Sequence, residues 1–187
     1  MVREMGSRLL TLLFFSVLYV APFPVEVRGE EGAAASGYSL GPGDKLRVTV
    51  FGEESLSGEF SVGGDGNISL PLIGEIRAGD RTITQLRDEV RQALGNGYLK
   101  DPRVSAEVIT YRPYFILGEV HSPGQYPYSI GLTVLNAVAT AGGFTYRADT
   151  DDVYIKKAGD STERRYNLNQ TVPILPGATI RIRERHF

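Results

Sequence analysis

Hydrophobic and polar residues alternate in short segments from residue 37 onward, and this pattern predicts β-strands. Residues 45–51 alternate over seven positions, as expected of a strand with one buried face. We expect residues 60–62 and 68–70 to form a hairpin around the Gly-rich segment 63–67, because such a turn needs residues that adopt positive φ. Further strands are predicted at residues 74–77 and 104–109.

A helix is predicted between these last two strands. Thr84 is the expected N-cap, and Leu86, Val90 and Leu94 recur at helical spacing, which indicates a buried stripe. Gly95 marks the end of the helix. These elements together predict an α+β unit that is complete at about residue 110.

The second half of the chain is predicted to have the same order of elements (strand, hairpin, helix, strand), although the sequence shows no convincing repeat. Thr133 is the expected N-cap of a helix that Gly142 and Gly143 end. The apolar residues predicted on this helix are Val134, Leu135, Val138 and Ala141. Strands are expected at residues 114–120, 126–128, 153–157, 164–168 and 179–183. One helix across four or five mixed strands is typical of a β-grasp-like fold.

The fold class is therefore α+β, with a small first domain over residues 36–110 followed by one β-grasp-like domain over residues 111–187. Residues 1–35 are expected to be a signal peptide and linker. Arg3 and Arg8 precede an apolar run over residues 9–21, which is too short for a comfortable membrane span, and small residues follow it. An uncleaved N-terminal anchor is the alternative.

Composition excludes several classes of chemistry. The chain has no cysteine, so disulfides, thiolate metal sites and cysteine lipidation are excluded. Its two histidines, His121 and His186, are too few for a multi-histidine metal site within one chain. The formal net charge of −2 argues against a nucleic-acid partner, because such proteins normally carry an excess of basic residues.

No motif predicts catalysis, and we expect no catalytic residue, metal or cofactor. Residues 37–41 match the G-x-S-x-G pattern of a nucleophile elbow at Ser39, but a strand rather than a helix follows them. The Gly-rich segment 63–66 joins two strands, and Gly142-Gly143 follows its helix, so neither offers a phosphate-binding loop. Acidic clusters such as Glu53-Glu54 are interpreted as solvated surface.

Two sets of residues are candidates for binding a polymer or a neighbouring subunit. Tyr114, Tyr126 and Tyr128 combine an apolar ring with a polar tip, which suits sugars and protein interfaces, although core residues are the alternative. Arg181 and Arg183 project from one face of the last strand. They are interpreted either as a contact for an anionic polymer or subunit or as protection of an edge strand.

Three segments carry a family resemblance. Residues 38–52 contain Gly41-Pro42-Gly43-Asp44, residues 65–74 follow, and residues 98–104 complete the first domain. In this order they resemble the polysaccharide biosynthesis/export family. The second domain is similar to that family's soluble-ligand-binding β-grasp (SLBB) domain. It carries the resemblance through Gly118, Pro123, Gly124, Gly142 and Gly143.

The resemblance implies a periplasmic, ring-forming component of an exopolysaccharide or capsule export machine at the outer membrane. Its implied partners are the exported polysaccharide and an inner-membrane polysaccharide co-polymerase. The motif glycines and prolines serve the fold in this family, so the resemblance implies no catalytic residue and no cofactor.

The chain departs from the larger members of that family, which carry a lipidated Cys, a second β-grasp repeat and a C-terminal pore helix. Phe187 follows the last predicted strand by four residues, too few for a spanning helix. We therefore expect a short member, which either lies beneath a separate outer-membrane β-barrel or extends the periplasmic conduit. The alternatives are a monomeric periplasmic glycan-binding module and, supported only by scattered carboxylates, an exported hydrolase.

Overall fold

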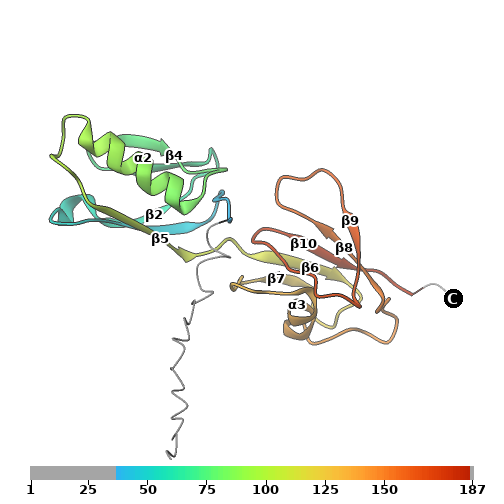
Figure 1. Ribbon diagram of the computed structural model, residues 1–187. Helices are drawn as coiled ribbons and strands as arrows, with labels where there is room; N and C mark the ends of the chain where they lie inside the picture. Colours follow the sequence, from blue (N-terminus) through green and yellow to red (C-terminus); the bar gives the residue numbers. More distant parts are fainter. Residues whose placement is uncertain (1–36, 186–187) are drawn as a thin grey trace, which may run out of the picture.

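The computed structural model describes residues 37–185, which fold into two units that follow one another along the chain (Figure 1), each with its own hydrophobic core. The predicted signal peptide and linker lie outside the described residues. The first core contains buried side chains between Leu40 and Leu94, and the second contains those between Tyr114 and Ile182. The chain crosses from one core to the other through residues 111–113.

The first unit is a three-stranded antiparallel sheet with one helix packed on it. Its elements are β1 (Lys45–Val50), the short 3-10 helix η2 (Glu54–Leu56), β2 (Gly58–Ser61), α2 (Ile83–Gly95) and β5 (Val104–Thr110). β1 lies between β2 and β5. Leu46, Val48 and Val50 are at most 2% exposed, so the alternation predicted for this strand is confirmed.

The hairpin predicted between residues 60–62 and 68–70 is wrong. β3 (Asn67–Leu70) pairs with β4 (Gly74–Arg77), while β2 pairs with β1. The Gly-rich segment leads the chain out of the first sheet, because Gly66 adopts a φ of 84° and accepts hydrogen bonds from the amides that follow β4. The Gly-rich segment does form a turn, in which the Gly66 backbone amide donates to the Gly63 carbonyl (2.9 Å), but the turn that joins two paired strands lies at Leu72, whose φ is 66°.

Helix α2 begins two residues earlier than predicted, with Thr82 rather than Thr84 as its N-cap. Thr82 and Gln85 form a capping box. The backbone amide of Gln85 donates to Thr82 Oγ1 (3.3 Å), and the backbone amide of Thr82 donates to Gln85 Oε1 of the side chain (2.9 Å). The buried stripe of Leu86, Val90 and Leu94 is confirmed, since each is at most 1% exposed.

The second unit is a five-stranded mixed sheet with one helix, as predicted. Its elements are β6 (Tyr114–Gly118), β7 (Gly124–Tyr126), α3 (Val134–Thr140), β8 (Asp152–Lys156), β9 (Arg164–Asn167) and β10 (Thr179–Ile182). The strand order is β7-β6-β10-β8-β9, with β6 and β10 parallel and the other pairs antiparallel. Thr133 caps α3 as expected, whereas Leu135 is 51% exposed and lies outside the core.

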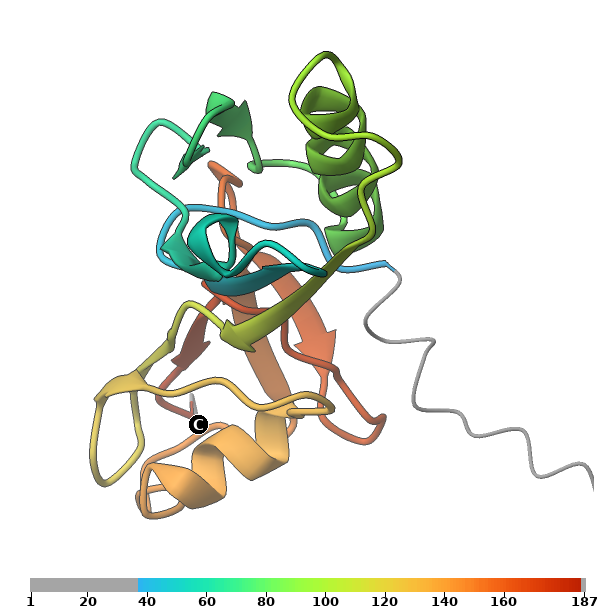
Figure 2. The same cartoon turned by 90° about the vertical axis from the view of Figure 1, so that its left-hand side faces the viewer.

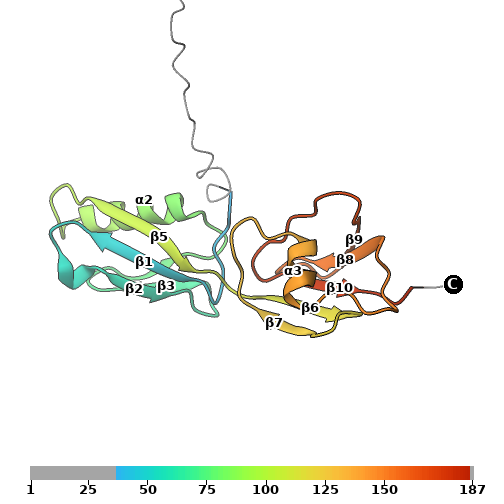
Figure 3. The same cartoon turned by 90° about the horizontal axis from the view of Figure 1, so that it is seen from below.

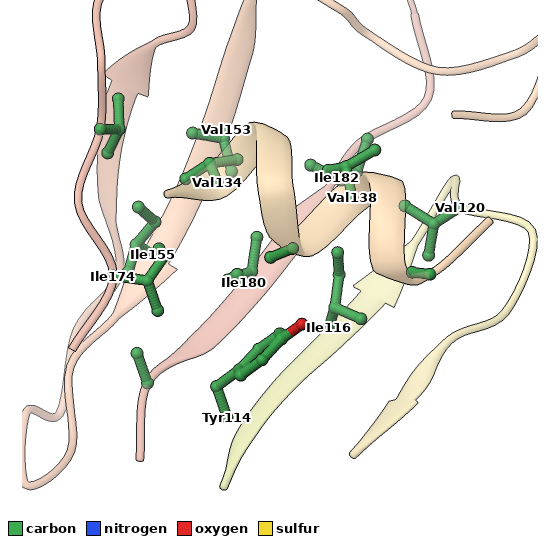
Figure 4. Close-up of a cluster of buried hydrophobic side chains, with 14 of the residues drawn as sticks. Tyr114, Ile116, Val120, Val134, Val138, Val153, Ile155, Ile174, Ile180 and Ile182 are labelled. Carbon is green, nitrogen blue, oxygen red and sulfur yellow. The ribbon is translucent and has the colours of Figure 1, made fainter. Parts of the chain in front are cut away.

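Helix α3 packs on one face of this sheet (Figure 4). Val134 and Val138 of the helix face Ile116, Ile155 and Ile180 of the strands. Burying each of these side chains stabilises the fold by about 1.5–3 kcal/mol. The second face of the sheet is left without a helix.

The two helices lie on opposite sides of the molecule. α2 covers the upper face of the first sheet in Figures 1 and 2, and α3 covers the lower face of the second. Figure 3, seen from below, shows α3 in front of its sheet and α2 behind its own. The uncovered faces of the two sheets therefore point in opposite directions.

Across residues 37–185, we find no helix with the length and hydrophobicity needed to cross a membrane. α2 has 13 residues and α3 has seven.

The motif residue Gly118 should be the most sensitive glycine of the second sheet. Its φ is 93°, and a Cβ atom there would lie 1.9 Å from the Ile182 carbonyl oxygen. We expect Gly118→Ala to lower the free energy of unfolding by more than about 2 kcal/mol. Gly124→Ala is the matched control, since its nearest neighbour would be 3.9 Å away, and should change stability by less than about 0.5 kcal/mol. Urea denaturation measures both, and equal effects would contradict the prediction.

Candidate functional site

The uncovered side of the second sheet, here called the open face, gathers apolar, aromatic and basic side chains. It comprises Phe115, Leu117, Tyr154, Lys156, Arg165, Arg181 and Arg183. Strand register aligns Leu117 with Arg181, Arg181 with Tyr154, and Tyr154 with Arg165, so one row crosses four strands. Ile180 and Ile182 point to the other side and are at most 1% exposed, as the alternation predicts.

The apolar part of the open face is on β6. Phe115 is 41% exposed and Leu117 is 40% exposed, two positions apart on the same strand. Large apolar side chains beside one another on an uncovered sheet are typical of a contact surface rather than of a solvated one.

The charged part of the open face has more cations than carboxylates. Arg181 pairs with Glu163, and Arg165 pairs with Asp152. Arg183 lies over the ring of Tyr154, with its Cζ 3.8 Å from the ring centroid, which is a cation–π contact. Lys156 is exposed, so the face keeps a positive excess.

The interpretation of these arginines as edge-strand protection is wrong. β10 lies in the middle of the sheet, between β6 and β8, and both neighbours form hydrogen bonds with it. The Nε of Arg181 is shielded from solvent and has no hydrogen-bond acceptor among the described residues.

The three predicted tyrosines do not join the arginines. Tyr114 is 1% exposed and its ring stacks on Tyr126 within the core, at 5.8 Å between centroids, so it offers no surface to a polymer. The Tyr126 hydroxyl donates to the Ser122 carbonyl (2.6 Å). Tyr128 is half-buried and packs edge-on against Tyr111, at 5.5 Å. The tyrosine of the open face is instead Tyr154, which only strand order could place beside Arg183.

A second cluster of polar side chains lies where the two units meet, around the carboxylate of Asp44, which is fully buried. This carboxylate accepts hydrogen bonds from the Tyr38 hydroxyl (2.6 Å), the Gly41 amide (2.8 Å) and the Arg112 amide (2.8 Å). Asp44 therefore fixes the start of the first unit to the crossing segment. A buried charge needs several such donors to offset its desolvation.

Arg112 extends this cluster into the second unit. Its Nε donates to the Pro176 carbonyl (3.2 Å), and its Nη1 lies 3.8 Å from the Asp44 carboxylate. A Cβ at Gly41 would lie 1.5 Å from Arg112 Nη1, so the glycine leaves room for the guanidinium. Gly41 and Asp44 thus have the same role, since both allow the Arg112 side chain to lie between the two units.

Aromatic rings close the junction beside these charges. Tyr38 meets Tyr111 edge-on at 5.1 Å, and Tyr111 meets Tyr128 in turn. Burial raises the pKa of Tyr38 far above its ordinary value, and the hydrogen bond to Asp44 raises it further. The hydroxyl therefore stays protonated and keeps donating to Asp44 at any physiological pH.

The other motif residues lie in turns. Pro42 and Gly43 shape the turn before β1, where Gly43 has a φ of 93°. Pro123 precedes β7, and Gly142 and Gly143, with φ of 83° and 91°, follow α3 as predicted.

Ser39 lies in a segment without regular secondary structure, which leads to β1 rather than to a helix. Among residues 37–185, no three His, Asp or Glu side chains are placed to hold a metal ion.

Removing the Asp44 carboxylate should loosen the junction. Asp44→Ala leaves the Gly41 and Arg112 amides without their acceptor, so we expect a loss of about 3 kcal/mol in the free energy of unfolding. Asp151→Ala is the control, since Asp151 is exposed and its backbone does not have a positive φ, and should change stability by less than about 0.5 kcal/mol. Urea midpoints test this, and similar losses in the two variants would refute the role of Asp44.

Sequence comparisons agree along most of the chain. A profile of polysaccharide biosynthesis/export proteins matches residues 32–109, and a profile of the SLBB domain matches residues 113–165. The exopolysaccharide production protein ExoF of Rhizobium meliloti (strain 1021) is 34% identical over 175 residues, which cover 85% of this chain and 41% of that protein.

Two further relatives are more distant. The EPS I polysaccharide export outer membrane protein EpsA of Ralstonia solanacearum is 27% identical over 154 residues (68% of this chain, 41% of that protein). The polysialic acid transport protein KpsD of Escherichia coli is 28% identical over 134 residues (70% and 24%). The chain thus matches 41% or less of the length of each of these relatives. With two matching profiles in the order of its two units, the chain belongs to the polysaccharide biosynthesis/export protein family.

Proposed function

We propose that this chain is a non-enzymatic subunit of a conduit that passes an exopolysaccharide or capsular polysaccharide across the cell envelope. The observation that carries the proposal is the ordered match of both units to the export family and its SLBB domain. The relatives are named for exopolysaccharide production, polysaccharide export and polysialic acid transport.

The arrangement of the described residues supports a contact function. The open face offers two exposed apolar side chains, a tyrosine ring and several cations on one rigid sheet. Aromatic rings suit sugar rings, and cations suit the carboxylates of acidic polymers or of a neighbouring subunit. The Asp44–Arg112 junction holds this face at a fixed angle to the first unit.

We infer that the protein is exported and works in the periplasm, in association with the outer membrane. The expected assembly is a ring of identical subunits, which uses the same two complementary surfaces on every copy. The expected partners are the exported polymer, an inner-membrane polysaccharide co-polymerase and a separate outer-membrane β-barrel.

Export of polymer by cells tests this function. Cells that lack the protein should lose extracellular polysaccharide, and the full-length wild-type chain should restore it. Arg181→Glu together with Arg183→Glu should restore at most about a tenth of the wild-type amount, because like charges then replace the cations of the open face. The measurement is extracellular polysaccharide per cell, with immunoblots to show equal protein abundance.

The matched control is Lys100→Glu with Arg103→Glu, which makes the same charge change on exposed residues of the first unit, away from the open face. It should export normally. Undiminished polysaccharide from cells that lack the protein would overturn the proposed function. A wild-type protein that remains monomeric but binds the purified polymer would favour the glycan-binding module instead.

A further inference from the structure

The first unit carries an acidic hollow whose charge is opposite to that of the open face. The hollow has a volume of about 390 Å³ and is lined by Glu59, Ser61, Asp65, Ser69 and Glu75, among others. Glu59 shares the single cation of Arg47 with Glu107, at 2.9 and 3.1 Å. Among the described residues, the carboxylates of Asp65 and Glu75 form no ion pair, although Arg77 Nη1 donates to the Asp65 backbone carbonyl (2.9 Å). The lining of the hollow contains three carboxylates and no Lys or Arg, so the hollow carries an excess of negative charge.

The two units as a whole also carry net charges of opposite sign. Residues 37–110 contain 8 basic and 11 acidic side chains, whereas residues 111–185 contain 9 basic and 7 acidic ones. The near-neutral charge of the whole chain thus hides a negative first unit and a positive second unit. Complementary potentials of this kind steer association and fix its orientation.

Geometry prevents the two surfaces of one molecule from meeting. Glu59 and Ser61 lie on the side of β2 that α2 does not cover, beside Arg47 and Glu107. This side faces away from the direction of the open face, because α2 and α3 cover opposite sides of the two sheets (Figures 1 and 2). Each copy can therefore contact one neighbour through its open face and another through its hollow.

We propose that the open face of the second sheet docks on the acidic hollow of a second copy of this chain. Arg183 and Lys156 bring the positive excess, Phe115 and Leu117 provide apolar area, and the hollow carboxylates accept from the cations. The alternative contact, between the open faces of two copies, would bring arginines against arginines. The contact between the open face of one copy and the hollow of the next is a head-to-tail contact, and it brings opposite charges together. Every copy that has two neighbours then uses both of its surfaces.

This contact rests on the proposed function, in that it supplies the repeated interface of the ring. A head-to-tail contact between identical subunits produces a closed ring when the rotation between copies closes, and an open filament when it does not. The junction at Asp44 sets that rotation, because it fixes the angle between the donor and acceptor surfaces.

Reciprocal charge reversal tests the contact. One variant carries Arg181→Glu and Arg183→Glu on the open face, and the other carries Glu59→Arg and Glu75→Arg in the hollow. Both are purified from cells that produce the full chain, and sedimentation velocity measures their association. Each variant alone should associate at least about tenfold more weakly than the wild type, because like charges then face one another.

An equimolar mixture of the two variants should regain wild-type association. In the mixture, the reversed open face of one variant meets the reversed hollow of the other, and the two unchanged surfaces meet as well. Lys100→Glu with Arg103→Glu is again the control and should associate like the wild type. Circular dichroism checks folding, and Glu75→Arg alone replaces the hollow variant if that variant misfolds.

Three results would overturn the contact. If the hollow variant associates normally while the open-face variant does not, the open faces meet one another. If the mixture stays as weak as each variant alone, the two surfaces are not partners. If both variants associate like the wild type, neither surface is an interface. The export assay is independent of these results, so each would leave the proposed function standing if cells without the protein fail to export.

Discussion

The buried carboxylate of Asp44 is the constraint on which the arrangement of the molecule depends. It accepts hydrogen bonds from the first residues of one unit and from the crossing segment, so a single side chain ties the start of the first unit to the segment that leads to the second. Arg112 then reaches the second unit through the Pro176 carbonyl. Without these bonds, three residues of chain would be the main link between the cores, and the opposite directions of the two uncovered sheet faces would not be fixed.

Much of the fold could be predicted because strands and helices here follow their own hydrophobic periods. Apolar residues alternate with polar ones over residues 45–51, as a strand with one buried face requires. Leu86, Val90 and Leu94 recur at helical spacing, as a helix with one buried face requires. The prediction that the strands on either side of residues 63–67 pair with each other was wrong for a physical reason. A Gly-rich segment is permissive and does not specify which strand pairs with which, whereas the turn at Leu72 carries no glycine signal at its centre. The capping box of Thr82 and Gln85 was visible in the sequence and would have given the correct start of α2.

The surfaces could be predicted only in part, because they depend on strand order. Alternation placed Arg181 and Arg183 on one side of β10, but it could not place β10 in the centre of the sheet or Tyr154 beneath Arg183. The tyrosines near the start of the second unit were close in sequence, yet Tyr114 lies on the same buried face of β6 as Ile116 and is part of the core. Asp44 was identified only as part of a motif, since its partner Arg112 lies 68 positions away.

Within residues 37–185 the two hydrophobic cores share no buried side chain, so a pulling force on the second unit cannot spread through common packing into the first. It passes instead through the crossing segment, the Arg112 contacts and the row of Tyr38, Tyr111 and Tyr128. These contacts break together only if they are loaded in parallel, and the hydrogen bonds to Asp44 are the shortest among them. Resistance to a force that separates the two units is thus concentrated around one acidic side chain.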